Sequence, residues 1–128
     1  MRHGPHSAFE GMKLMKRFLV LYLVPSAVVE NWKSTDPATR EPAEQKMRAA
    51  WNEWMGEHAA AVSGTEAGGK TKRVTASGIS DTKNDIMLYA FAEAESHEAA
   101  ARMFAHHPHL QIPNASIEVM EVRPMTGP

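Results

Sequence analysis

The sequence predicts an α+β fold, and three patterns carry that prediction. Residues 18–24 and 86–92 are continuous apolar segments of strand length, typical of strands covered on both faces. Between them, Met47, Trp51 and Trp54 recur at steps of four and three, which places them on one helical face. Together with less apolar strands and a second, shorter helix, these segments give the order β-α-β-β-α-β, which is the ferredoxin-like plan. We therefore expect an antiparallel four-stranded sheet with two helices on one face.

The first half of the chain is expected to form one strand and one long helix. Pro25 ends the strand over residues 18–24, and the polar residues 30–41 are expected to form a loop. Pro42 is a favourable first helical residue, so a helix is expected over residues 42–62, before Ser63 and Gly64.

The second half is expected to supply the remaining strands and a short helix. The glycine-rich residues 64–69 predict a flexible loop, and residues 70–77 predict an edge strand or a hairpin arm. Residues 78–85 are expected to form a turn before the apolar strand 86–92.

A second helix is expected over residues 96–105, with Ser96 as its N-cap and an end before Pro108. The last strand is expected over residues 116–123, closed by Pro124. In the ferredoxin-like plan the two most apolar strands would lie at the centre of the sheet.

The first strand predicts a dimer. Phe18, Val20 and Tyr22 lie on one face of it, whereas Leu19 and Leu21 lie on the other. Two helices can cover only one face of the sheet. We therefore expect a second copy to cover the other face, which gives a homodimer built as a dimeric α+β barrel.

Composition limits the domain organisation and the partners. At 128 residues the chain fits one domain, expected over residues 16–127. Residues 1–15 are expected to be an N-terminal extension, either disordered or an artefact of start-site assignment. Fourteen basic residues balance 15 acidic ones, which favours neither nucleic acid nor a membrane surface. The absence of cysteine excludes thiolate chemistry and is compatible with the cytoplasm.

Four short segments resemble the YCII-related and DGPF-domain group of the dimeric α+β barrel superfamily. They are WNEWMGEH at 51–58, GKTK at 69–72, HPHL at 107–110 and IEV at 117–119. The resemblance covers nearly the whole chain and implies a homodimer with a pocket between sheet and helices. The group's Asp-Gly-Pro-Phe motif is missing, because residues 77–80 read Ser-Gly-Ile-Ser. No histidine occurs between His6 and His58, so the histidine–aspartate pair of the enzymes close to YciI does not carry over.

The histidine-rich segment offers candidate catalytic residues. His107 or His109 could act as a general base, since imidazole is suited to proton transfer near neutral pH. Glu118 could orient the imidazole, and the alternative is that it is an edge-strand glutamate in water that discourages edge pairing. The alternative is that Pro108 sets a turn and the imidazoles cap helix carbonyls. A metal site formed by these histidines with His106 matches no standard spacing, so we expect no metal and no cofactor.

Other side chains are candidates for ligand binding. Aromatic side chains often line ligand pockets. The candidates are Tyr22, Trp54, His58, Lys72 and Tyr89. Lys72 or its neighbour Arg73 could also stabilise an oxyanion. For Trp54 and His58 the alternative is ordinary packing of the helix on the sheet.

Two functional hypotheses follow. The first is a cofactor-independent enzyme of the lyase, isomerase or monooxygenase type, which uses a histidine base on a small molecule. The second is a non-catalytic dimeric module that binds a small molecule or serves as an accessory subunit. The fold alone does not choose between them.

Overall fold

The computed structural model describes residues 14–125. The N-terminal extension expected over residues 1–15 therefore lies almost wholly outside the described residues, as do residues 126–128. The described part of the chain forms six strands, three α-helices and one 3-10 helix. Within it, no helix is both long enough and apolar enough to cross a membrane.

Four strands form one antiparallel sheet in the order β2-β5-β1-β6. The central strands are β1 (Lys16–Leu23) and β5 (Ile86–Ala94), and the edges are β2 (Val62–Ala67) and β6 (Ser116–Glu121). The two most apolar segments of the sequence are thus at the centre, as expected. Central strands have neighbours on both sides and are covered most completely, which explains their continuous apolar composition.

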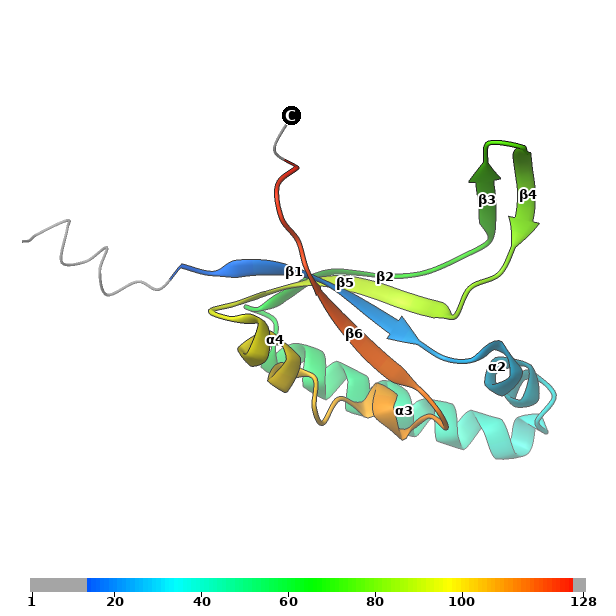
Figure 1. The fold of residues 1–128 in the computed structure, drawn as a ribbon. Helices are drawn as coiled ribbons and strands as arrows, with labels where there is room; N and C mark the ends of the chain where they lie inside the picture. Colours follow the sequence, from blue (N-terminus) through cyan, green and yellow to red (C-terminus); the bar gives the residue numbers. More distant parts are fainter. Residues whose placement is uncertain (1–13, 126–128) are drawn as a thin grey trace, which may run out of the picture.

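The helices lie mainly on one side of this sheet. The long helix α3 (Pro37–Glu57) and the short helix α4 (His97–Met103) lie beneath it, whereas α2 (Ser26–Lys33) lies beyond the end of β1 (Figure 1). Ser96 caps α4 as predicted, because its Oγ accepts a hydrogen bond of 3.1 Å from the Ala99 amide.

The prediction of a loop over residues 30–41 is wrong, because α2 and the first turn of α3 occupy most of these residues. The helix begins at Pro37 rather than at Pro42, with Asp36 as its N-cap residue. Proline at the first helical position removes no hydrogen bond, since an amide N–H at that position would have no acceptor within the helix. Pro42 lies inside the helix near its N-terminal end, where a missing amide removes a single hydrogen bond.

The predicted helix end and the following loop are also wrong. Helix α3 ends at Glu57, and Val62, expected on the helix, instead begins β2 and is buried. The residues expected as a glycine-rich loop over 64–69 largely form β2, paired with β5. Gly64 has a φ of +65° where the register shifts between Ser63 and Glu66, a backbone conformation that favours glycine.

A hairpin interrupts the expected β-α-β-β-α-β order. It consists of β3 (Thr71–Thr75) and β4 (Gly78–Thr82), which form a separate two-stranded sheet. The expectation of a hairpin arm over residues 70–77 is confirmed for β3, but the turn expected over 78–85 is largely strand. Figure 1 shows the hairpin rising from the sheet on the side opposite α3 and α4.

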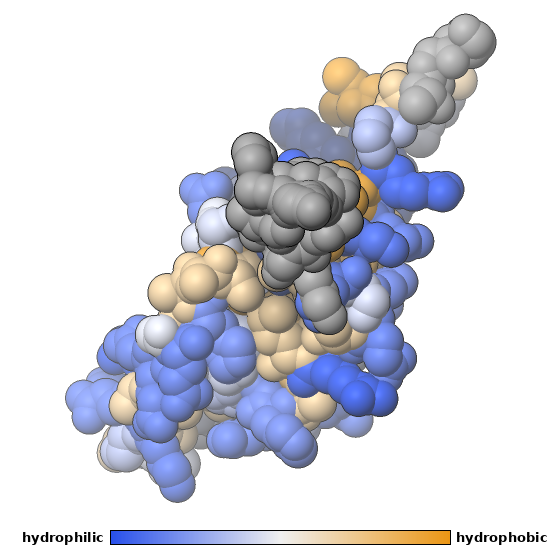
Figure 2. All heavy atoms as spheres, turned by 90° about the vertical axis from the view of Figure 1, so that its left-hand side faces the viewer, coloured by the Kyte–Doolittle hydropathy of each residue, from blue (hydrophilic) through white to orange (hydrophobic). Residues whose placement is uncertain are grey.

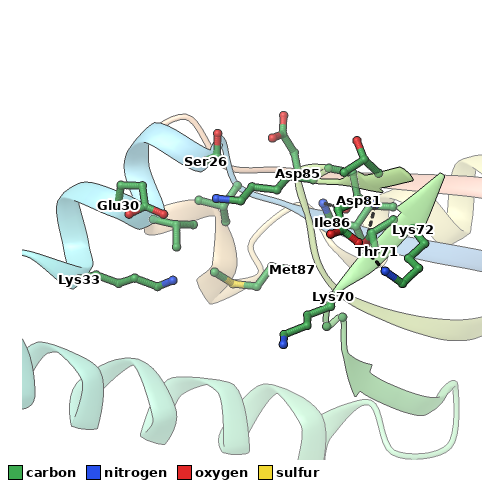
Figure 3. A pocket seen from close by; sticks show the side chains of 17 residues that line it. Ser26, Glu30, Lys33, Lys70, Thr71, Lys72, Asp81, Asp85, Ile86 and Met87 are labelled. Carbon is green, nitrogen blue, oxygen red and sulfur yellow. Dashed lines mark hydrogen bonds and ion pairs between the residues drawn. The ribbon is translucent and has the colours of Figure 1, made fainter. Parts of the chain in front are cut away.

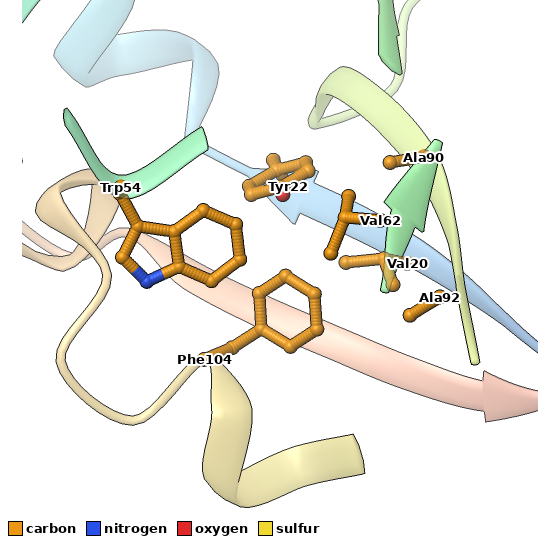
Figure 4. Packing of buried hydrophobic residues seen from close by; sticks show 7 residues of the cluster. All are labelled: Val20, Tyr22, Trp54, Val62, Ala90, Ala92 and Phe104. Atoms are coloured by element: carbon orange, nitrogen blue, oxygen red, sulfur yellow. The ribbon is translucent and has the colours of Figure 1, made fainter. Parts of the chain in front are cut away.

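The core lies between the sheet and the helices. Val20, Tyr22, Trp54 and Phe104 pack there, together with small residues of β5 (Figure 4). On the other face of β1, Leu19, Leu21 and Leu23 are only half-buried. The alternation predicted for this strand is therefore confirmed, and no described helix lies over its second face (Figure 1). We call that second face the open face.

Candidate functional site

The histidine-rich segment folds into a 3-10 helix, η1 (Pro108–Gln111). His107 has an extended backbone, as expected for a residue that precedes proline. Its Nδ1 accepts a hydrogen bond of 2.9 Å from the His109 amide, so His107 caps the N-terminus of η1. One of the two alternatives left open by the sequence was capping of helix carbonyls, and the structure shows the opposite polarity, with the His107 imidazole accepting from an amide.

His109 fixes η1 to the sheet. Its Nε2–H donates a hydrogen bond of 3.0 Å to the carbonyl of Leu23, the last residue of β1. His107 and His109 are both buried, with exposed fractions of 1% and 0%. Their neighbour His106 is exposed. The three histidines therefore have different environments, and only two of them face the core.

Aromatic side chains surround these two imidazoles. The His107 ring lies 4.3 Å from both Trp51 and Trp54 and 5.2 Å from Tyr22, measured between ring centroids. The His109 ring lies 5.4 Å from Tyr22 and 6.5 Å from His107. Side chains from two distant parts of the chain thus lie side by side. We call Tyr22, His107 and His109 the polar triad.

The polar triad contains an unusual number of unpaired polar atoms. Four buried side-chain nitrogen or oxygen atoms have no hydrogen-bond partner within residues 14–125, and three of them are Tyr22 Oη, His107 Nε2 and His109 Nδ1. Native proteins pair nearly all such atoms, and an unpaired buried one costs about 1–3 kcal/mol. Their concentration in one place makes the triad the strongest candidate site.

The existing hydrogen bonds assign a role to each unpaired atom. His107 Nδ1 accepts a bond, so neutral His107 carries its proton on Nε2 and presents a donor. His109 uses its Nε2–H as a donor, so its Nδ1 is an acceptor. Tyr22 adds a hydroxyl that can do either. The triad therefore offers one donor, one acceptor and one hydroxyl.

Burial keeps all three side chains neutral. Desolvation, with smaller contributions from His109 and His58, lowers the pKa of His107 to about 4. Burial also lowers the pKa of His109, against the opposing effect of the Leu23 and Ser116 carbonyls. Desolvation raises the pKa of the Tyr22 hydroxyl. An imidazole with a lowered pKa is a weak general base at neutral pH.

We predict that the free energy of unfolding declines on acidification because these buried imidazoles become protonated more readily in the unfolded chain. His107 titrates near pH 6.5 when unfolded but at about 4 when folded, so the unfolded chain binds more protons between these values. Stability should be complete above pH 6.5 and fall as the pH approaches 4, by on the order of 2 kcal/mol from this group. Urea unfolding at pH 7.5 and 4.5 measures the loss. His107→Asn keeps a capping acceptor and should flatten the dependence, whereas His106→Asn should not; an unchanged slope in His107→Asn would refute the assignment.

Glu118 does not approach the histidines. It lies opposite Leu21 in the ladder, so its exposed side chain is on the open face, whereas Tyr22 lies on the helix-covered face. The proposed pairing of Glu118 with His109 is therefore wrong for geometric reasons. Tyr89 also pairs with Leu21, on the open face, and its hydroxyl donates to the Glu66 carboxylate at 3.2 Å.

The remaining ligand-binding candidates are divided between two places. Trp54 is in the aromatic wall of the triad, and His58 stacks on it at 3.8 Å while its Nδ1–H donates to the Trp54 carbonyl at 2.8 Å. His58 is thus a half-buried and hydrogen-bonded residue. Lys72 is far from this group, on β3, where it forms an exposed ion pair with Asp81.

Lys72 and Asp81 line a separate cleft of about 670 Å³ between α2 and the base of the hairpin. Figure 3 shows Lys33 on α2 and Lys70 on the facing side, both extending into this space. Glu30, Asp81 and Asp85 also line it, so charges of both signs are present. The cleft contains none of the triad residues and has no comparable set of buried unpaired atoms.

Phe104 completes the aromatic wall, and the sequence reading missed it. It lies 5.1 Å from Trp54 and 6.1 Å from His107 between ring centroids. A signal was available, because Phe104 follows Ala100 by four residues, the spacing of neighbours on one helical face. Among the described residues, no three His, Asp or Glu side chains are grouped as a metal site would require.

No protein-family model matches the chain, and no curated protein matches its sequence. The site is therefore judged on its geometry and chemistry.

Proposed function

We propose that this protein is a dimeric module that binds a small, uncharged, flat molecule at the polar triad. The observation that carries the proposal is that three neighbouring side chains, with ring centroids 5.2–6.5 Å apart, each have an unpaired buried atom: Tyr22 Oη, His107 Nε2 and His109 Nδ1. A ligand with an acceptor for His107 and a donor for His109 would satisfy both imidazoles. An amide or a phenol has such a pair of functions.

The surroundings support a neutral aromatic ligand. Trp51, Trp54 and Phe104 supply flat apolar surfaces, which are common in small-molecule sites. Trp51 is only half-buried, so the aromatic wall of the triad reaches the molecular surface at this residue. Since both imidazoles are neutral, an anion would find no opposite charge there.

Binding is favoured over catalysis by a histidine base. No carboxylate among the described residues is hydrogen-bonded to either imidazole, and the lowered pKa of His107 weakens it as a base. A reaction of the lyase, isomerase or monooxygenase type would need a base tuned closer to neutrality. A binding module needs only the unpaired polar atoms and the aromatic walls, whereas an enzyme would also need a base with a pKa near neutrality.

The proposal includes the ferredoxin-like plan, the dimeric α+β barrel and membership of the YCII-related group. The strand order supports it, since β1 and β5 are central and β3–β4 can be treated as an insertion. The half-buried leucines of the open face support a homodimer through that face. The cysteine-free sequence supports a cytoplasmic location.

The test is a titration of the protein with phenol and with benzamide. Binding is monitored through the imidazole resonances of His107 and His109 in NMR spectra. We expect both sets of resonances to shift and Trp fluorescence to change. Tyr22→Phe should weaken binding about tenfold, as expected for one lost hydrogen bond. Tyr89→Phe is the matched control, because it removes a tyrosine hydroxyl from the opposite face.

Unfolding experiments on the same variants separate a binding role from a structural one. Removal of an unpaired buried hydroxyl should leave the free protein as stable as before or more stable, since function often costs stability. A Tyr22→Phe variant that loses stability and binds both probes like the wild type would contradict the proposal. Conversion of a probe to product in a His109-dependent manner would favour the enzyme instead.

A further inference from the structure

The β3–β4 hairpin carries an apolar pair that the fold leaves uncovered. Val74 and Ile79 lie directly opposite each other in the ladder and so share one face, and their exposed fractions are 73% and 70%. A two-stranded hairpin without further packing is only marginally stable in water. We call Val74 and Ile79 the arm pair.

The hairpin stands on the same side of the sheet as the open face (Figure 1). It connects the end of β2 to the start of β5, and Leu23 at the end of β1 pairs with Ile86 there. The arm pair is therefore at the end of the sheet where β1 finishes, and it projects beyond the half-buried leucines of the open face.

A second exposed apolar group lies at the opposite end of the sheet. It includes residues just before β1 and residues at and after the end of β6, and Val122 is hydrogen-bonded to Arg17 near the start of β1. Its members are Leu14, Met15, Met120, Val122 and Met125, with exposed fractions from 38% to 99%. We call them the strand-start patch. Figure 2 views this end of the molecule, and the most hydrophobic groups visible lie in its upper half, toward the open face.

We propose that the hairpin is a dimerisation arm whose arm pair packs on the strand-start patch of a second copy. A two-fold axis across the strands would place two open faces against each other with their ends exchanged. Each arm would then reach the partner's patch, so the contact forms twice. This inference rests on the homodimer of the proposed function and names the segment that completes its interface.

The size of the sheet indicates why an arm is needed. Four strands at about 4.8 Å spacing, with eight residues in β1 at about 3.3 Å each, cover only about 500 Å² in outline. A stable interface buries about 800 Å² on each partner. Two arm contacts at the ends of the stacked sheets would supply much of the difference and would continue the interface formed by the open faces.

The test measures dimer dissociation by sedimentation over a concentration series. Val74→Thr combined with Ile79→Thr keeps strand-forming residues but removes the apolar pair, and it should raise the dissociation constant at least about tenfold. Met120→Thr in the strand-start patch should act in the same direction. Leu110→Thr is the control, because Leu110 is an exposed apolar residue of η1, beneath the helix-covered face.

Amide hydrogen exchange supplies a second readout. The amides of residues 71–82 should be protected in the wild-type dimer and lose protection in a monomeric variant. A dissociation constant unchanged by the Val74→Thr and Ile79→Thr pair would overturn the arm and leave the homodimer standing. A wild-type chain that is monomeric at every concentration would instead refute the proposed dimer, and with it the arm.

Discussion

Replacement of His109 by alanine is expected to lower the free energy of unfolding by about 3 kcal/mol. The imidazole is fully buried, and its removal leaves a cavity beside Tyr22. It also removes the hydrogen bond to the Leu23 carbonyl, which ties η1 to the end of β1 across 86 residues of sequence. Both effects act in the same direction, and the second one loosens the segment that carries His107.

The measurement is urea unfolding at one protein concentration, since the proposed dimerisation would link stability to concentration. His106→Ala is the matched control, because this histidine, three positions after the last residue of α4, is exposed. Its effect should stay within about 0.5 kcal/mol. Equal losses in the two variants would show that the burial of His109 does not contribute as the structure implies.

The prediction that His109 is structurally important goes beyond what its sequence position indicates. Histidines after a helix are usually read as surface caps, because helix C-termini favour such side chains. The residue before a proline is extended, however, and this turns the chain after Phe104 back under the sheet. Burial of His107 and His109 follows from that turn and from contact with Tyr22, a residue more than eighty positions away. Such a long-range contact leaves no periodic signal.

The sequence signals were strong for β1 and β5 and weak for β2. Residues 18–24 and 86–92 are apolar on both faces, so their central position follows from composition alone. Strand β2 contains Ser63, Gly64 and Thr65, and only Val62 is buried, so local propensity favours a loop. Its ladder with β5 decides the conformation, which is a tertiary effect. Helix α2 has no buried residue at all, which agrees with the polar composition from which a loop was predicted.

Glu118 illustrates the limits of reading a site from sequence. The alternation in β6 correctly placed Glu118 with Ser116 and Met120, on the face opposite Ile117 and Val119. The sequence could not show which of these faces the helices cover. Because the helices cover the Ile117 and Val119 side, Glu118 is exposed on the open face. The same alternation places Leu21 beside Glu118, which makes Leu21 the residue best suited to test the dimer.

Leu21→Lys is expected to raise the dimer dissociation constant on the order of 100-fold or more. Leu21 lies at the centre of the open face, between Tyr89 and Glu118 on the neighbouring strands. In a two-fold dimer the substitution occurs twice, so two ammonium groups would have to be desolvated in one interface together with the neighbouring Glu118 carboxylates. Within a single copy, the new lysine can pair with Glu118 and remain in water. The fold of each copy should therefore persist while the dimer is lost.

Light scattering after size-exclusion chromatography gives the mass of each variant, and circular dichroism verifies that the chain remains folded. Leu110→Lys is the control, since it introduces the same charge at an exposed leucine beneath the helix-covered face. A folded Leu21→Lys variant with the mass of the wild-type dimer would place the interface elsewhere. A folded Leu21→Lys monomer, with Leu110→Lys still dimeric, would assign the interface to the open face, because the same charge beneath the helix-covered face would have left the dimer intact.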